Sequence, residues 1–166
     1  CANRSVYLWD GTDGAWNDAT KWTVGGEPVD AAPNGAFLIT GDSGGAYGPQ
    51  AELPAGAYTI DVVDNIVLGK SAWAGSNAVG LKFDDGATAD VTLRSTSGAL
   101  IDGSVVNSVS ITSPKNGKLT LDGVSYQCGQ NTSFTVAEGS TVVLTNGASV
   151  FATSHGTVNV NSKNAK

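Results

Sequence analysis

Short phrases of alternating apolar and polar residues recur along the chain, and each phrase ends at a glycine. In most copies two apolar residues flank a polar one, and an acidic or amide residue follows before the glycine. The copies are 81–86, 119–123, 134–139 and 142–147, with a looser one at 99–103. Alternation with a period of two is typical of a β-strand, and Asp or Asn before Gly is typical of a turn. The recurrence indicates β-structure built in similar increments.

No stretch of the sequence keeps a helical period, so we expect an all-β protein. The alternating runs predict strands at 57–63, 65–68, 79–83, 89–94, 105–111, 118–121, 132–136, 141–145 and 157–161. Two architectures fit this spacing. In a short β-solenoid, or parallel β-helix, apolar residues stack inward from coil to coil, and an exterior face would carry Thr92, Ser110, Thr120, Thr135 and Asn159. In an antiparallel β-sandwich or jelly roll the glycines would lie at hairpins. The recurrence favours the solenoid.

The chain changes character near residue 57. Residues 1–56 are rich in turn formers and hold three of the four tryptophans and most of the prolines. Residues 57–166 hold the strand-and-glycine series. We therefore expect one domain, in which 1–56 form an irregular N-terminal cap and 57–166 form the repeat-like strand region.

The charge of the chain narrows the classes of partner. Its net charge is −6 and its nine basic residues are scattered, whereas nucleic acids and anionic membrane surfaces attract clustered Lys and Arg. The sequence also lacks an apolar run of the roughly 20 residues that a membrane-spanning helix requires. We expect no nucleic-acid partner and no membrane insertion.

Tryptophans recur at intervals of seven and six residues in the cap segment, at Trp9, Trp16 and Trp22. This spacing resembles the opening of bacterial autotransporter-type and related surface-protein passenger regions, in which Trp-Gly, a further Trp and then Asn-Trp precede a β-helix. Lys21 stands where that pattern has Asn. The matching stretches are Trp9-Asp10-Gly11, Trp16, Trp22, 29–33 and 36–40.

The resemblance implies a secreted or cell-surface protein of a Gram-negative bacterium, in which this segment closes the first coil of a β-helix. It carries over no catalytic residue, because the matching positions are structural in that family. The implied role is that of a stalk, an adhesin or a scaffold. Its partners would then be a glycan or protein on a host surface, or neighbouring domains of the same protein. Exposed strand edges at the end of such a stack would also favour self-association.

Two groups of residues could carry a metal or a crosslink. Asp10, Asp13, Asn17 and Asp18 form a dense set of oxygen ligands of the kind that calcium prefers, although Asx turns explain the same residues without an ion. We predict no other cofactor. Cys1 and Cys128 could form a disulfide or remain two independent thiols, and Cys1 could instead be the lipidated first residue of a bacterial lipoprotein.

Aromatic side chains in loops are the candidates for ligand contact, because flat rings stack on sugars. Trp73 lies in a loop of small residues and is the preferred candidate, followed by Trp16 and Trp22; each could instead pack on its own neighbours. The Gly-Asp-Ser-Gly-Gly string at 41–45 resembles a protease motif, but the single histidine, His155, follows it in the chain, whereas that mechanism needs one that precedes it.

The sequence therefore predicts a non-catalytic, secreted or surface-exposed structural or adhesion module. A carbohydrate-binding β-sandwich is the alternative function, and a fragment of a β-helical polysaccharide-degrading enzyme is a further one.

Overall fold

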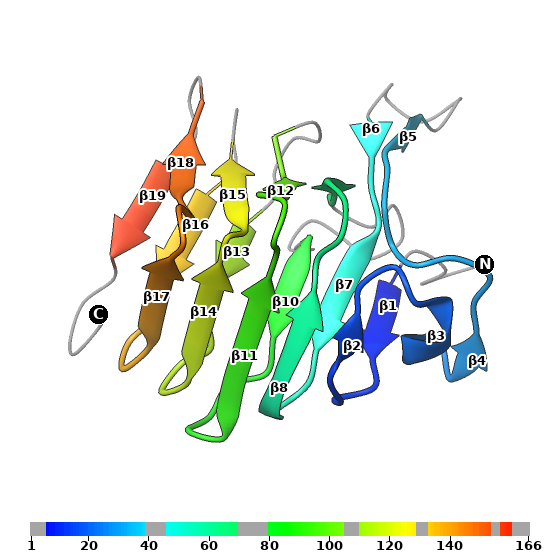
Figure 1. Cartoon of the computed structure of the whole chain (residues 1–166), viewed down its shortest axis with the longest axis horizontal. Coiled ribbons are helices and arrows are strands. Elements are labelled where there is room, and N and C mark those ends of the chain that lie inside the picture. The colour runs from blue at the N-terminus through cyan, green and yellow to red at the C-terminus, as the bar shows by residue number, and fades with distance from the viewer. Residues whose placement is uncertain are drawn as a thin grey trace.

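The computed structural model describes residues 6–38, 46–69, 80–104, 110–128, 133–153 and 157–160. Within these residues the protein is all-β with several parallel sheets, apart from one 3-10 turn, η1 (Ala19–Lys21). Figure 1 shows the strands side by side in a stack, with the N-terminal segments at one end and the C-terminal strands at the other.

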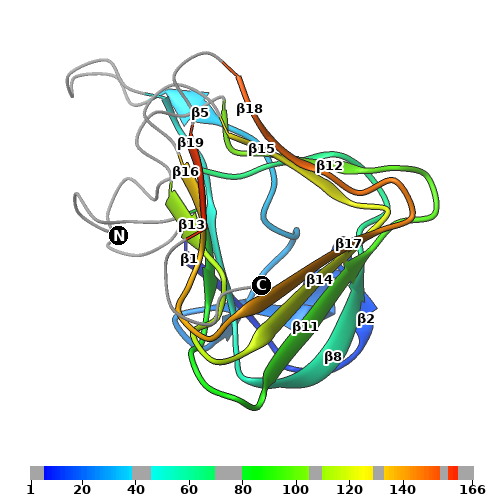
Figure 2. The same cartoon turned by 90° about the vertical axis from the view of Figure 1, so that its left-hand side faces the viewer.

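The stack has three sides (Figure 2). The long sheet has the order β17-β14-β11-β8-β2, and the short sheet has the order β18-β15-β12-β9. The third side, here called the mixed face, consists of β10-β7-β1-β3-β4 followed by β13-β16-β19, with β10 beside β13. A two-stranded sheet, β5-β6, lies apart from these.

The strands have the following bounds. The long sheet contains β2 (Gly14–Ala15), β8 (Gly56–Asp61), β11 (Ala89–Arg94), β14 (Lys118–Asp122) and β17 (Thr141–Thr145). The short sheet contains β9 (Ile66–Val67), β12 (Leu100–Asp102), β15 (Ser125–Cys128) and β18 (Val150–Ala152). The mixed face contains β1 (Val6–Trp9), β3 (Trp22–Val24), β4 (Glu27–Pro28), β7 (Gln50–Leu53), β10 (Leu81–Phe83), β13 (Ser110–Thr112), β16 (Ser133–Val136) and β19 (Thr157–Val160). The remaining pair is β5 (Phe37–Leu38) and β6 (Ala46–Tyr47).

The chain passes repeatedly from the mixed face to the long sheet and then to the short sheet, as β7-β8-β9, β10-β11-β12, β13-β14-β15 and β16-β17-β18. The ladders between these passes are parallel. Antiparallel pairing within the described ranges joins β1 to β3, β3 to β4 and β5 to β6.

The core is made of rows of apolar side chains that run from strand to strand. In the long sheet one row contains Ile60, Leu93, Leu121 and Leu144, which are aligned by the strand register. The first three are at most 3% exposed, whereas Leu144 on β17 is 47% exposed. The mixed face shows the same change from buried to exposed: Phe134 on β16 is buried, whereas its register partner Val158 on β19 is 43% exposed. The inner rows are therefore covered along the stack and open at its C-terminal end in the described residues.

Side chains at the corners hold successive passes together. Asp13 Oδ1 accepts a hydrogen bond from the Thr59 N–H (2.7 Å), and Asp85 Oδ1 accepts one from the Lys115 N–H (2.8 Å). The turn after β14 has Gly123 at φ +70°, a conformation that favours glycine. Asn146 in the next turn donates to Asp122 Oδ1 (2.5 Å). Many of the Asp and Asn residues of this chain thus stabilise turns.

Several strand predictions are confirmed. β11 and β17 have the predicted bounds, and 118–121, 132–136 and 157–161 differ from β14, β16 and β19 by one residue. The strands β12, β15 and β18, which form most of the short sheet, were not among the predicted strands. The predicted run 105–111 overlaps β13 only at its end, and residues 105–109 lie outside the described part of the chain.

The prediction that Thr92, Ser110, Thr120, Thr135 and Asn159 share one exterior face is wrong. Thr92 pairs with Thr120 in the long sheet, but Ser110, Thr135 and Asn159 belong to strands of the mixed face. The two sets differ because the chain visits three sheets in turn, so that similar phrases fall on different sides. The residues before position 57 are joined to the rest by the pairing of β7 with β10 and of β2 with β8.

Candidate functional site: a hollow beside the tryptophan cluster

Three tryptophans pack together at the N-terminal end of the stack. Trp22 lies between Trp9 and Trp16 with edge-on contacts, at ring-centroid distances of 5.0 and 4.8 Å, and Tyr7 meets it at 6.5 Å. The three indoles are 1–2% exposed. Each indole N–H donates to a backbone carbonyl: Trp9 to Thr12 (2.8 Å), Trp16 to Pro33 (3.0 Å) and Trp22 to Trp16 (2.7 Å). Aromatic packing and satisfied N–H groups make this cluster part of the hydrophobic core.

The burial of these rings is relevant to Trp16 and Trp22, which the sequence predicts as ligand contacts. A side chain that stacks on a sugar must offer one face to solvent, and Trp22 at 1% exposure has none to offer. The structure gives Trp22 a packing role in place of the predicted contact. Trp16 is also buried, but it contributes to the lining of a hollow. Trp73 lies outside the described residues, and its role stays a prediction.

The acidic residues of the cap are used in turns. Asp10 Oδ1 accepts from the N–H (2.9 Å) and hydroxyl (2.7 Å) of Thr12, and its Oδ2 lies 3.5 Å from Lys21 Nζ. Burial alone raises the pKa of Asp10, but the hydrogen bonds from Thr12 and the charge of Lys21 outweigh it and hold the pKa below its usual value. Asp18 accepts from the N–H (3.0 Å) and hydroxyl (2.6 Å) of Thr20, and these bonds lower its pKa. Asp18 thereby caps η1.

The predicted calcium ligands are directed to different partners. Asp10 and Asp18 each bond within their own turn, and Asp13 bonds to β8. Asn17 lines the hollow described next. Over the described ranges, no three or more His, Cys, Asp or Glu side chains are grouped so that they could hold a metal ion. Calcium binding by this set stays a prediction without a preformed ligand group.

A hollow of about 420 Å³ lies beside the tryptophan cluster. Three segments build it: the chain around η1, the segment that follows β4, and the turn between β8 and β9. It is lined by Trp16, Asn17, Ala19, Asp30, Ala31, Ala32, Asn34, Val63, Asp64, Asn65 and Ile66. A second, more open hollow of about 620 Å³ shares Asp30 and Ala31 with it and extends to Tyr7, Val24, Glu27, Pro28 and Val29.

Two asparagines fix the walls of the first hollow. Asn34 Oδ1 accepts a hydrogen bond from the Val67 N–H (2.8 Å), and Asn65 Oδ1 accepts one from the Leu100 N–H (2.9 Å). These bonds join the segment after β4 to β9 and the β8–β9 turn to β12. The hollow is therefore held between ordered backbone segments, which favours a preformed site.

Three further polar side chains of the hollow are exposed and have no hydrogen-bond partner among the described residues. They are Asn17, Asp30 and Asp64. Among the described residues the lining contains no Lys, Arg or His, so this part of the hollow is acidic. The apolar side chains that it exposes are Val63 and Ala31, whereas Trp16 and Ile66 in the lining are at most 3% exposed. Sequence reasoning named Asn17 and Trp16 but missed Asp30 and Asp64, because each reads as an ordinary turn residue.

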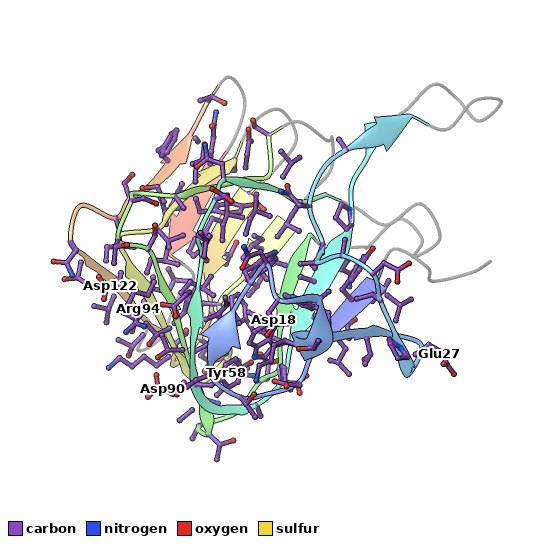
Figure 3. The ribbon with its side chains drawn as sticks, turned by 45° about the vertical axis from the view of Figure 1, so that its right-hand side comes forward. Asp18, Glu27, Tyr58, Asp90, Arg94 and Asp122 are labelled. Carbon is purple, nitrogen blue, oxygen red and sulfur yellow. The ribbon has the colours of Figure 1, made fainter. Side chains whose placement is uncertain are left out.

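The long sheet carries charge on its outer surface. Arg94 binds Asp61 on the neighbouring strand through Nη2 (2.7 Å) and Nε (2.8 Å), and Asp122 is its register partner on the other side. Figure 3 shows Arg94, Asp122 and Asp90 along the outer edge of this sheet, away from Asp18 and Glu27 of the cap. The Arg94 and Asp61 side chains are about half exposed, so the pair stabilises the fold only slightly.

Two tyrosines of the core are held in the neutral form. Burial raises the pKa of Tyr58, whose hydroxyl donates to the Pro54 carbonyl (2.6 Å). Burial also raises the pKa of Tyr126, which packs against Phe134 with a centroid distance of 5.7 Å. Neither phenol is placed to act as an acid or base at neutral pH.

The predicted disulfide involves one residue outside the described range. Cys1 is not described, so its pairing stays a prediction. Cys128 at the end of β15 is buried, with its Sγ 3.4 Å from the Phe151 carbonyl oxygen. The string at 41–45 and His155 also lie outside the described residues.

Comparison of the chain with protein-family models, with curated proteins and with solved structures returned no match. The described residues contain no helix with the length and apolar character needed to cross a membrane.

Proposed function

We propose that this chain is a short β-solenoid that serves as a non-catalytic structural and adhesion module of a secreted or cell-surface bacterial protein. The observation that carries the proposal is the repeated passage of the chain through three parallel sheets with apolar rows in register. An arrangement of this kind forms an elongated scaffold whose outer surface can vary while its core is kept.

The distribution of polar groups supports a scaffold. Carboxylates and amides accept backbone hydrogen bonds from neighbouring segments of the stack, as Asp13, Asp85 and Asn65 do. These groups stabilise the stack and are not gathered around a common point where a reaction could take place. The buried tryptophans at one end support the role of the N-terminal segment as a cap. The surface location rests on the resemblance of that segment to autotransporter-type passengers.

The acidic hollow favours carbohydrate as the class of ligand for such an adhesin. Open carboxylates and amides beside apolar side chains can bond to sugar hydroxyls while the apolar surface covers the ring. A β-solenoid that binds glycans would combine the adhesion module predicted from the sequence with the carbohydrate binding of the alternative function.

The experiment is a binding and turnover screen with the complete chain. We expect it to bind a subset of an array of glycans and host-surface proteins, and to release no reducing ends or unsaturated products from a panel of polysaccharides. Turnover of any polysaccharide would overturn the non-catalytic assignment. A chain that binds no glycan and no host-surface protein would overturn adhesion and leave only the scaffold.

A further inference from the structure

We infer that the hollow beside the tryptophan cluster is the glycan-binding site and that it binds a neutral or amine-bearing sugar ring. This inference rests on the proposed adhesive function and adds to it the position of the site and the chemical class of the ligand. Its volume of about 420 Å³ lies within the range of about 300–1,000 Å³ that is typical of small-molecule sites.

The polar groups of the hollow divide into those that build it and those that are open. Asn34 and Asn65 are used by the backbone of β9 and β12, and the Trp16 indole N–H is used by Pro33. These bonds fix the walls before any ligand arrives. Asp30 and Asp64 form no hydrogen bond with the other described residues and are therefore open to a ligand.

Carboxylates at these positions determine which ligands fit. A carboxylate accepts hydrogen bonds from sugar hydroxyls, and it attracts an ammonium group more strongly still. Phosphorylated, sulfated or carboxylated sugars need a basic partner, and none of the described lining residues is Lys, Arg or His. The same two carboxylates would repel these anions. Neutral sugars and amino sugars are therefore expected to bind, and uronic and sialic acids are not.

The apolar part of the hollow fits the carbon face of a sugar. The apolar surface that a ligand can reach comes from Val63, which is 49% exposed, and from Ala31, since Trp16 and Ile66 are buried. Contact with such a surface removes apolar C–H groups from water while the hydroxyls bond to Asp30, Asp64 and Asn17. This arrangement needs no calcium, because a bound ion would occupy the carboxylate oxygens that the hydroxyls use.

The test is saturation-transfer NMR and titration calorimetry on the complete chain in EDTA. The probes are glucose, galactose, mannose and glucosamine, with glucuronic acid and N-acetylneuraminic acid as anionic controls. We expect at least one neutral or amino sugar to bind and the anionic sugars not to bind. The variant Asp64→Ala should weaken binding about tenfold or more, because it removes a hydrogen bond to a charged group. Asp90→Ala, on the outer side of the long sheet, should leave binding unchanged.

Other outcomes overturn the inference in distinguishable ways. If Asp64→Ala and Asp90→Ala bind the sugar equally, the ligand binds elsewhere, and the adhesive function stands without this site. Binding that requires added calcium, or that prefers the anionic sugars, contradicts the stated chemistry of the hollow. If the chain binds no sugar but still binds a host-surface protein, the ligand class is wrong while adhesion stands. Urea unfolding of both variants shows whether each is folded; if Asp64→Ala is unstable, Asp30→Asn takes its place.

Discussion

Two leucines in one inner row allow the open end of the stack to be tested. Leu121 on β14 and Leu144 on β17 are register partners in adjacent strands, but their exposures are 3% and 47%. Leu121 is covered on both sides, by Leu93 and Leu144. Replacing it with alanine removes buried methyl groups and leaves a cavity, for which we expect a loss of about 3 kcal/mol in the free energy of unfolding.

Replacing Leu144 with alanine should cost much less. About half of its side chain is already in contact with water in the folded state, and its open side leaves no closed cavity when the side chain is shortened. We expect a loss of about 1 kcal/mol, from roughly half of the burial energy of a leucine. The same substitution is made in the same sheet, so each variant is the control for the other.

The assay is urea unfolding in dilute solution, followed by far-UV circular dichroism. The expected result is a clear difference in midpoint between Leu121→Ala and Leu144→Ala with similar slopes. Equal losses of stability would refute the reasoning, since they would mean that Leu144 is covered in solution as fully as Leu121. A smaller loss for Leu121→Ala than for Leu144→Ala would contradict the stacking of the row itself.

Further predictions concern the turns, the cap and the open end. Alanine at Gly147, at φ +81° with open space around it, should cost about 1 kcal/mol. Alanine at Gly123 should cost roughly 3 kcal/mol, because its Cβ would also collide with the Ser95 carbonyl oxygen; equal losses in thermal unfolding would contradict this. The variant Trp73→Phe retains the three buried tryptophans, so its fluorescence should be blue-shifted and poorly quenched by acrylamide, and a red-shifted, readily quenched signal would contradict the cap. The folded pKa of Asp10 is lowered, so its contribution is complete above the ordinary value of 3.8 and is lost as the pH falls through the folded pKa. The variant Asp10→Asn should therefore be less stable by under about 1 kcal/mol at neutral pH, and the gap should close in acid; a gap that persists in acid would argue against this ionisation. Light scattering should show association at high concentration through the exposed β17 edge, and a strict monomer would count against it.

The strands that could be predicted are those whose inward side chains are plainly apolar. β11 alternates Ala89, Val91 and Leu93 with polar residues, and its bounds were predicted correctly. β15 was missed because its sequence is Ser-Tyr-Gln-Cys. Its inward residues are Tyr126 and Cys128, which pack as apolar side chains although they do not read as a typical strand. The turn signal at Asp122-Gly123 was recognised, but no strand was predicted directly after it.

The candidate site was less accessible to sequence reasoning than the fold. Its open carboxylates, Asp30 and Asp64, lie more than thirty residues apart and are each explained by turn preference. Hydrogen bonds of Asn34 and Gly35 with Val67, and of Asn34 with the Asn65 carbonyl, bring these segments together. The tryptophans were more informative, since their regular spacing in a turn-rich segment singled out three rings that pack together and are buried in the structure.

The order of the strands along the stack determines how the molecule would respond to a pulling force. The N-terminal segments and the last strands lie at opposite ends (Figure 1), and the ladder hydrogen bonds run from strand to strand between them. Tension between the two ends would therefore open these bonds one after another, as in a zipper, without having to shear a whole ladder at once. Later passes pair residues 23 or 24 positions apart, as in Lys118 with Thr141 and Ser133 with Thr157. Each of these later passes would release about 80 Å of extended chain as it unwinds, so that the molecule would lengthen in steps under load.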